Sequence, residues 1–244
     1  MAKEVPRTRT GIEGLDSMLG GGIPSGRIVI VSGGPGAGKT TLAIQFLVNG
    51  IQRYGENGLY VSLDEPRERI FEYAEYYGWD LEEPYREGKL AFLDASPYAM
   101  SERVEPKKLI QVMKAKALSA KAKRISVDPL VALTIQYPDP VQRRWAILEL
   151  FKSLRETGAT SIITNEVGSG QNRAVLLEEY LADGVIILRS SQVDRWRVRT
   201  IEIEKMRGTM IDEQMRPYII NEKGLSVISE KDIFTFAAGL LMKK

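Results

Sequence analysis

The chain has 244 residues, and its hydrophobic content of 43% is enough for a sizeable core. With 34 basic and 32 acidic residues, the formal net charge is +2, so overall charge gives no indication of a nucleic-acid partner. Cysteine and histidine are absent, which excludes disulfides, thiol chemistry and histidine as a general base or metal ligand. Because no apolar run is long enough for a membrane span and no signal-peptide pattern is visible, we expect a cytoplasmic protein without membrane contacts.

The first residues are polar and predict an extended N-terminal arm over 1–9. Residues 10–244 are expected to form a single domain, because no internal repeat, low-complexity tract or second domain is visible. Within residues 10–26, Leu15, Met18 and Leu19 can share one face of a short helix that three glycines end. Taken alone, this segment is a linker into the first strand.

A phosphate-binding loop is predicted at residues 33–41, which fit G-x-x-x-x-G-K-[ST]. A β-branched run at 27–31 precedes it and apolar residues at helical spacing follow over 41–52, so the loop is expected between a strand and a helix. Those flanks disfavour the alternative of an ordinary glycine-rich turn. The predicted nucleotide-binding residues are Gly33, Gly34, Pro35, Gly36, Ala37, Gly38, Lys39, Thr40 and Thr41.

The composition of this loop suits a nucleoside triphosphate. Glycines let the backbone turn tightly and aim N–H groups at phosphate oxygens, and the helix N-terminus adds the positive end of its dipole. Lys39 is expected to reach the β- and γ-phosphates, and the Thr40 hydroxyl is expected to bind Mg²⁺. ATP and Mg²⁺ are therefore the expected ligands.

Two acids follow the strand predicted at 59–63, and Pro66 then suits the start of a helix. Asp64 or Glu65 at the carboxyl end of this strand is expected to polarise the water that attacks the γ-phosphate. Because adjacent strand residues point to opposite faces, only one of the pair is expected to face the nucleotide. The alternative is a solvated acidic helix start that complements the helix dipole.

A further acid is predicted to place the metal. After a third strand at 89–95 and a lysine-rich helix at 104–122, residues 124–128 read as a buried strand ending in Asp128. This is the Walker B pattern, in which Asp128 holds Mg²⁺ opposite Thr40. The helix lysines are interpreted as a solvated face rather than a DNA-binding stripe, because no aromatic residues interleave with them.

The next segments are predicted as a turn-rich loop at 129–140, a helix at 141–156 and a strand at 160–166. The helix is expected to pack on the sheet through Trp145, Leu148, Phe151 and Leu154. The polar tip of the strand is a candidate sensor of the γ-phosphate. The loop at 168–172 is flexible by composition and is followed by a single cation, Arg173.

The C-terminal part predicts a strand at 183–189, a long hairpin strand at 195–205 with a bulge or sheet twist between Val198 and Ile201, and an edge hairpin at 215–227. Lys205 and Arg207 would project to the same side of an extended edge strand as a two-cation clamp. The alternative is that both are solvated edge charges. The apolar tail at 233–242 is expected to be a docked helix.

The pattern T-G-[IV]-x-G-L-D-x-[ML]-L-x-G-G-[IL]-P-x-G at 10–26, leading directly into the phosphate loop, resembles the KaiC and RadA branches of the RecA-like ATPases. The resemblance to a single KaiC-type domain extends to about residue 228, with further matches at 63–66, 77–81, 93–97, 124–128 and 205–209. It implies an α/β RecA-like P-loop fold, with a mostly parallel central sheet flanked by helices and a C-terminal antiparallel hairpin extension. It also implies a homo-oligomer, a hexameric ring of Mg²⁺-dependent ATPase subunits, in which Lys205 and Arg207 reach the nucleotide of the neighbouring subunit.

Three departures from the family pattern bear on activity. The clock members carry two such domains, and this chain has one. Their phospho-acceptor pair falls at Glu179 and Tyr180, which leaves protein kinase activity open. The first acid of the catalytic pair is Asp64 rather than glutamate, and its shorter reach predicts slow hydrolysis.

The leading function is therefore a ring ATPase whose nucleotide state acts as a switch on an unknown protein partner. One alternative is a RadA-like DNA-binding recombination ATPase. It is less favoured because no helix-hairpin-helix module precedes the core and the expected DNA loop has little positive charge. The other alternative is an ATP-binding scaffold with very slow hydrolysis, which Asp64 keeps open.

Overall fold

Short runs rich in valine and isoleucine form the central strands, because β-branched side chains favour extended backbone. The computed structural model describes residues 5–96, 106–167, 175–193 and 195–229. Its strands are β1 (Arg7–Thr8), β2 (Ile23–Pro24), β3 (Ile28–Gly33), β4 (Gly58–Ser62), β5 (Leu90–Asp94), β6 (Arg124–Asp128), β7 (Thr160–Glu166), β8 (Gly184–Val193), β9 (Trp196–Met206), β10 (Arg216–Asn221) and β11 (Gly224–Val227). Its helices are α1 (Leu15–Met18), α2 (Lys39–Tyr54), α3 (Arg67–Tyr76), α4 (Glu82–Arg86), α6 (Pro106–Ser119), α7 (Val131–Thr134), α8 (Pro140–Thr157) and α9 (Leu177–Leu181).

Nine of the described strands form one sheet in the order β11-β10-β9-β8-β3-β7-β6-β4-β5. Neighbours from β8 to β5 are parallel, whereas β9, β10 and β11 pair antiparallel. Strands β1 and β2 form a separate two-stranded sheet. The predicted α/β fold, a mostly parallel sheet with a C-terminal antiparallel extension, is therefore confirmed.

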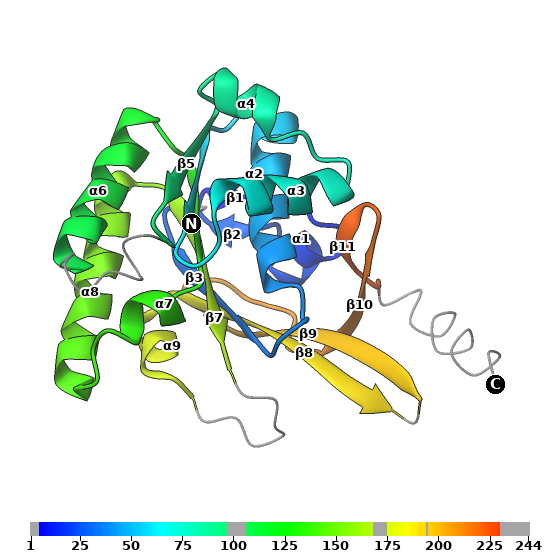
Figure 1. Cartoon of the computed structure of the whole chain (residues 1–244). Coiled ribbons are helices and arrows are strands. Elements are labelled where there is room, and N and C mark those ends of the chain that lie inside the picture. The colour runs from blue at the N-terminus through cyan, green and yellow to red at the C-terminus, as the bar shows by residue number, and fades with distance from the viewer. Residues whose placement is uncertain (1–4, 97–105, 168–174, 194, 230–244) are drawn as a thin grey trace.

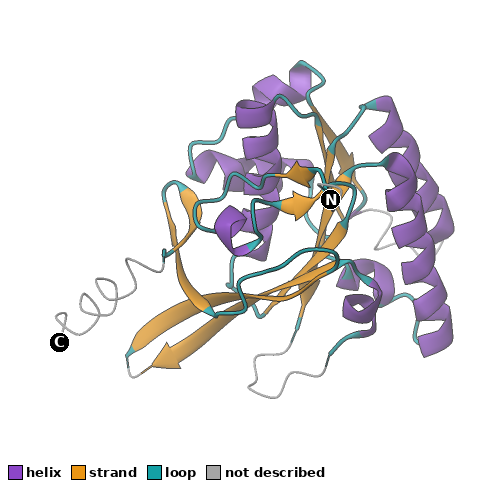
Figure 2. Cartoon of the chain, turned by 180° about the vertical axis from the view of Figure 1, so that it is seen from behind, coloured by secondary structure: helices purple, strands orange, loops and turns teal. Residues whose placement is uncertain are grey.

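Helices cover both faces of the sheet (Figure 1 and Figure 2). Along β3, Val29 and Val31 point into one core, which also contains buried residues of α1, α2 and α3. Ile28 and Ile30 point to the opposite core, beneath α6 and α8. A strand buried on both faces reads as a continuous apolar run, which is the pattern that predicted β3.

A buried arginine fixes the helix that follows the phosphate loop. The Arg124 side chain of β6 is 1% exposed, and its guanidinium donates to the Glu56 carboxylate at 2.6 Å and to the Phe46 carbonyl at 2.9 Å. Gly50 of α2 leaves the necessary space, because a Cβ there would lie 2.3 Å from the Arg124 Cδ. These contacts hold α2 against β6, with the start of the helix at the carboxyl ends of the strands.

Helix α8 packs on the sheet through a stripe that shares Phe151 and Leu154 with the predicted one but excludes Trp145. Trp145 is 67% exposed, whereas Ile147, Leu150, Phe151 and Leu154 are buried. The predicted stripe repeated every three residues and drifts around a helix of 3.6 residues per turn. The buried set follows the i, i+3, i+4, i+7 spacing that keeps one face toward the core.

The segment predicted as a turn-rich loop at 129–140 contains the short helix α7. Leu130 and Leu133 are buried against the core on the α8 side of the sheet, and their burial favours a helical turn there. Among the helices that the structure describes, none is long and apolar enough to cross a lipid bilayer.

The β8–β9 hairpin carries its irregularity at a different position from the one predicted. Its register is continuous from Val198 to Ile201 and shifts between Val185 and Ile186, which leaves Glu204 as the extra residue. The predicted bulge between Val198 and Ile201 is therefore wrong. Val198 is half-buried on the face opposite Ile201, so ordinary strand alternation explains the apparent slip.

Strand β9, which carries Lys205, is also not an edge strand in the order of the sheet, since it lies between β8 and β10. The predicted edge hairpin is confirmed, because β11 ends the sheet. Strand β10 pairs with β9 at Thr200 and Ile201. Among the described strands, only β8 pairs with the end of β9 that approaches Lys205.

Candidate functional site

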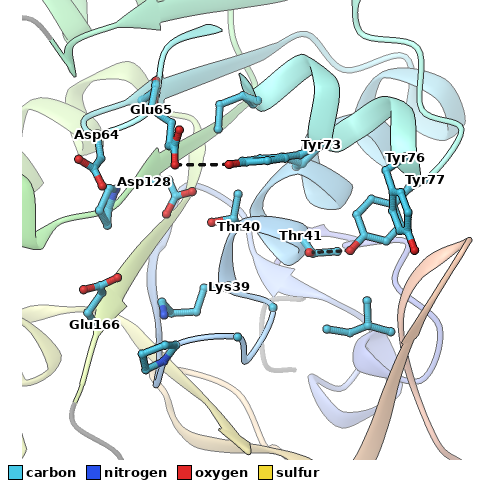
Figure 3. Close-up of a pocket in the computed structure, with 18 of the residues that line it drawn as sticks. Lys39, Thr40, Thr41, Asp64, Glu65, Tyr73, Tyr76, Tyr77, Asp128 and Glu166 are labelled. Atoms are coloured by element: carbon cyan, nitrogen blue, oxygen red, sulfur yellow. Dashed lines mark hydrogen bonds between the residues drawn. The ribbon is translucent and has the colours of Figure 1, made fainter. Parts of the chain in front are cut away.

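A cavity of about 600 Å³ lies at the carboxyl ends of β3, β7, β6 and β4. This is where functional groups gather in open α/β sheets. Figure 3 shows the cavity with Asp64, Asp128 and Glu166 on one side, Lys39 and Thr40 in the middle, and Tyr76 and Tyr77 on the other side. The lining residues are Pro35, Gly36, Gly38, Lys39, Thr40, Thr41, Ile44, Ser62, Asp64, Glu65, Ile70, Tyr73, Tyr76, Tyr77, Asp128, Pro129, Glu166, Arg199 and Ile220.

Lys39 is a buried cation held by its own loop. Its amine donates to the carbonyl oxygens of Gly33 at 3.0 Å and Gly34 at 3.1 Å. Burial lowers the pKa of Lys39, and the negative charges of Glu166 and Asp128 oppose that shift. A buried amine whose hydrogen-bond partners are main-chain oxygens is suited to exchange them for the oxygens of a phosphate.

The start of α2 is open to an anion. Helix α2 begins at Lys39 after Gly38, whose φ of 92° lies in the left-handed region that favours glycine. No side chain caps this end, and its first turn contains no acidic residue. The unpaired N–H groups and the positive end of the dipole therefore face the cavity, which fits a phosphate group.

Asp128 is held in the cavity as an oriented carboxylate. It is 7% exposed, and its Oδ2 accepts from the Tyr60 hydroxyl at 2.8 Å while its Oδ1 accepts from the Thr164 hydroxyl. Burial and the neighbouring carboxylate raise the pKa of Tyr60 well above its usual value, so this hydroxyl remains a donor. Asp128 and Thr40 line the same cavity, as a Walker B acid and a loop threonine should.

The oxygen ligands around the cavity fit Mg²⁺ bound together with a nucleotide better than a metal ion bound by protein side chains alone. No group of three or more acidic side chains in the described parts of the chain could hold a metal. Mg²⁺ in nucleotide sites is typically bound by one or two protein oxygens together with phosphate oxygens and waters. The Thr40 hydroxyl and the Asp128 carboxylate supply that number.

Asp64 and Glu65 both line the cavity, and that only one of them faces the nucleotide stays a prediction. Strand β4 ends at Ser62, and side-chain alternation does not extend beyond it. Tyr73 donates to Glu65 Oε1 at 3.4 Å, and the Ser62 hydroxyl donates to the Glu65 carbonyl. Asp64 is exposed and makes no hydrogen bond or ion pair with any described residue.

Lys205 and Arg207 do not line this cavity. The Lys205 amine donates to the carbonyl oxygens of Glu179 and Tyr180 at 3.0 Å and of Ala182 at 2.7 Å. The Arg207 guanidinium reaches the Tyr180 carbonyl at 3.2 Å. The two cations therefore lie together at the end of α9, and both donate to the Tyr180 carbonyl.

Some lining residues were not among those predicted. Arg199 of β9 lines the cavity, and its buried Nε has no hydrogen-bond partner in the part of the chain that the structure describes. The signal was the alternation of Arg195, Arg197 and Arg199, which continues on the face of the buried Ile201. Tyr73 and Tyr76 of α3, and Tyr77 at its end, also line the cavity, and none of them was predicted as a site residue.

Strand β10 adds a contact to the phosphate loop that the sequence did not indicate. The Tyr218 hydroxyl donates to the Ala37 carbonyl, and burial raises the pKa of Tyr218, so it stays protonated. Ile220 from the same strand lines the cavity. The C-terminal hairpin therefore supports the loop as well as closing the sheet.

Several expectations fall outside the described residues. These are the first four residues of the N-terminal arm, residues 104–105 of the lysine-rich helix, the loop at 168–172 with Arg173, and the tail at 233–242.

Known proteins share much of this sequence and its fold. The sequence model of the family described as "ATPase: KaiC" matches residues 8–232. The circadian clock protein KaiC3 of Synechocystis sp. is 39% identical over 92% of this chain and 46% of its own length. The circadian clock oscillator protein KaiC of Picosynechococcus sp. is 40% identical over 92% of this chain and 45% of its own. The chain therefore spans less than half the length of these relatives.

Among solved structures, the crystal structure of a KaiC-like protein from the hyperthermophilic archaeon Pyrococcus horikoshii OT3 superposes with a TM-score of 0.84. The two sequences are 31% identical, and the match covers 93% of this chain and all of the archaeal one. A protein of similar extent thus has the same fold, with the predicted RecA-like architecture.

Proposed function

Because the chain belongs to the KaiC family of ATPases, we propose that it binds ATP together with Mg²⁺ and hydrolyses the γ-phosphate. The observation that carries this proposal is the convergence of Lys39, Thr40 and Asp128 with two further acids on one cavity. These side chains come from three places in the chain, the phosphate loop, the end of β4 and the end of β6, and their chemistry is that of a P-loop enzyme.

Binding is assigned to the phosphate loop and the start of α2. Lys39 would give up the carbonyls of Gly33 and Gly34 for the β- and γ-phosphates, and the open N–H groups of α2 would receive other phosphate oxygens. Thr40 and Asp128 would hold Mg²⁺, which supplies charge neutralisation at the phosphates. Tyr60 and Thr164 act as positioning residues by fixing the Asp128 carboxylate.

Hydrolysis is assigned to the acid pair after β4. Asp64 or Glu65 would orient and polarise the attacking water. Glu65 is held by Tyr73, whereas Asp64 is exposed and has one methylene less reach than glutamate. Slow turnover is therefore part of the proposal, and an ATP-binding scaffold that scarcely hydrolyses its ligand is the second candidate.

Assembly into a homo-hexameric ring is also proposed, with Lys205 and Arg207 contacting the nucleotide of the neighbouring subunit. Support comes from their placement: the two cations lie together yet outside their own subunit's cavity. The ATP or ADP state of such a ring would act as a switch on a protein partner.

The binding proposal is tested by calorimetric titration of the full chain with ATP and Mg²⁺. Lys39→Ala should abolish measurable binding, while Lys108→Ala, which removes an exposed lysine from α6, should bind as the parent does. Equal ATP affinity for Lys39→Ala and the parent would overturn the assignment. Phosphate release by the parent, measured at saturating ATP, then separates an ATPase from a scaffold.

A further inference from the structure

A second hollow, of about 500 Å³, lies against α3 and α4 and is separate from the nucleotide cavity. Acidic residues dominate its lining. The carboxylates are those of Glu68, Glu72, Glu75, Asp80 and Glu82. We call this hollow the acidic groove.

The negative charge of the acidic groove is compensated only in part. Its lining contains no lysine or arginine, although the chain as a whole has a net charge of +2. Glu68 and Glu72 pair with arginines of α3 at 3.3 and 3.2 Å. The side-chain carboxylates of Glu75 and Glu82 make no hydrogen bond or ion pair with any described residue, whereas Asp80 Oδ1 accepts from the backbone N–H of Glu82 at 2.8 Å. Several carboxylates on one small concave surface repel one another, so a cationic ligand would relieve that repulsion.

The floor of the acidic groove is apolar. Phe71 and Leu81 are buried there, and the half-buried Trp79 also lines the groove. An indole beside carboxylates is a favourable place for a guanidinium or ammonium group, through cation–π attraction, and for an aliphatic side chain. This lining therefore favours a peptide that combines basic and apolar residues over a free metal ion, and it repels nucleic acid.

A short chain of contacts joins the acidic groove to the phosphate loop. The Tyr77 hydroxyl lies 3.2 Å from the Thr41 Oγ1, as the dashed line in Figure 3 marks. The Tyr77 ring stacks on the Trp79 ring, with 4.7 Å between centroids and 27° between planes. Thr41 and Tyr77 line the nucleotide cavity, whereas Trp79 lines the acidic groove.

Helix α3 also has a side chain on each of the two hollows. Its Tyr73 and Tyr76 line the nucleotide cavity, and its Glu72 and Glu75 line the acidic groove. A small shift of α3 when ATP replaces ADP would therefore change the spacing of the groove carboxylates. Such a coupling requires that ATP and ADP contact the phosphate loop differently. The Thr41–Tyr77 hydrogen bond joins that loop to the end of α3 and is placed to transmit the difference.

We propose that the acidic groove docks a basic segment of a partner protein, with an apolar side chain on Trp79 and lysines or arginines against the flanking carboxylates. The nucleotide changes the affinity of this docking through Thr41, Tyr77 and Trp79. The effect of the nucleotide on docking rests on the proposed function, whereas docking itself does not, since it needs no hydrolysis.

The probe is a short fluorescein-labelled peptide with two arginines on each side of a central leucine, titrated against the full chain by fluorescence anisotropy. The titration is made with ADP and with a non-hydrolysable ATP analogue. The test variant is Glu72→Lys combined with Glu75→Lys, both exposed positions outside the nucleotide cavity. The matched control is Glu13→Lys combined with Glu222→Lys, which makes the same charge change at exposed positions elsewhere.

The test variant should bind the peptide about tenfold or more weakly than the parent, because two attractive charge pairs become repulsive. The control should stay within a small factor of the parent, apart from a general charge effect that salt screens. A Tyr77→Phe variant should still bind the peptide but with the same affinity in both nucleotides. The parent should differ between them by about fivefold or more.

Other outcomes overturn the proposal. If the parent does not bind the peptide, or binds it as tightly after charge reversal, the acidic groove is not the docking site. If the test variant instead loses self-association in sedimentation, the groove is occupied by a second copy of this chain and the partner assignment is wrong. Equal affinity of the parent in both nucleotides overturns the coupling. Calorimetric ATP binding, measured on the same preparations, is expected to be unchanged in the test variant, so failure of the docking proposal is distinguishable from failure of ATP binding.

Discussion

The Lys205 amine lies 3.0 Å from the carbonyl oxygen of Glu179, one of three main-chain oxygens around it at the end of α9. Burial lowers the pKa of Lys205, and the adjacent Arg207 lowers it further, against the attraction of Asp183. These contacts hold the amine in place before any neighbouring subunit is present. Three carbonyl oxygens match the three N–H donors of the ammonium, so the proposed contact with a neighbour's nucleotide requires Lys205 to exchange them for phosphate oxygens.

The first prediction is that hydrolysis belongs to the assembly. An arginine finger contributes about 10³–10⁵ in rate in enzymes of this class, so Arg207→Ala and Lys39→Ala should each be nearly inactive alone. Mixing the two should restore part of the phosphate release, because a mixed interface can pair an intact loop with an intact Arg207. Specific activity of the parent should also rise with protein concentration. Mixed rings that form, as shown by sedimentation, but stay inactive would contradict the assignment in trans.

The second prediction separates the acids. Asp128→Asn should weaken Mg²⁺-dependent ATP binding, because it removes the charge that places the metal. Asp64→Asn and Glu65→Gln should keep ATP affinity, and one of them should lower turnover by about 10²–10⁴, as expected for a lost general base. The family position favours Asp64. Calorimetry and phosphate release, measured on the same three variants, check the division.

A matched control for the acid pair is Glu68→Gln, which changes a carboxylate of α3 that does not line the nucleotide cavity. It should leave both ATP binding and turnover as in the parent. If Asp64→Asn, Glu65→Gln and this control all turn over at the parental rate, water activation by these carboxylates is excluded.

Local patterns accounted for most of the fold and the centre of the site. The phosphate loop was predictable because its glycines, Lys39 and Thr40 act within one turn of chain. Asp128 was predictable because it ends a buried strand at the edge where such sites form. Arg199 and Tyr218 were not, because their approach to the loop depends on the pairing of β8, β9 and β10 far along the sequence. That Asp64 and Glu65 both line the cavity was not indicated for a different reason: the pattern extended the strand to Leu63, whereas β4 ends at Ser62.

The third prediction concerns the cost of burying Lys39. A lysine whose pKa is lowered in the folded state makes that state less stable while the lysine is charged. The lost stability is regained as the pH rises toward the ordinary lysine pKa of about 10.4. The unfolding temperature of the ligand-free parent, relative to Lys39→Met, should therefore increase between about pH 7 and pH 10.4.

The measurement is thermal unfolding of both proteins across that pH range, with Lys108→Met as the control. The control should differ from the parent by an amount that does not vary with pH, because Lys108 is exposed. A constant difference between the parent and Lys39→Met would contradict the prediction. ATP with Mg²⁺ should raise the unfolding temperature of the parent and leave that of Lys39→Met unchanged.

The last prediction assigns a second cation to ATP binding within the subunit. Arg199 lines the nucleotide cavity, and its buried Nε has no partner among the described residues, so a ligand oxygen can satisfy it. A hydrogen bond to a charged group contributes about 1.5–3 kcal/mol, so Arg199→Met should weaken ATP binding by about tenfold to a hundredfold.

Arg189→Met is the matched control, because the Arg189 Nε is also buried without a partner among the described residues but Arg189 does not line the cavity. Removing Arg189 also breaks its ion pair with Glu202, so this control should lose at least as much thermal stability as Arg199→Met. Calorimetry should nevertheless show that Arg189→Met binds ATP with the parental affinity, whereas Arg199→Met does not. An equal loss of ATP affinity in both variants would mean that Arg199 acts through the fold of the hairpin and not through contact with the nucleotide.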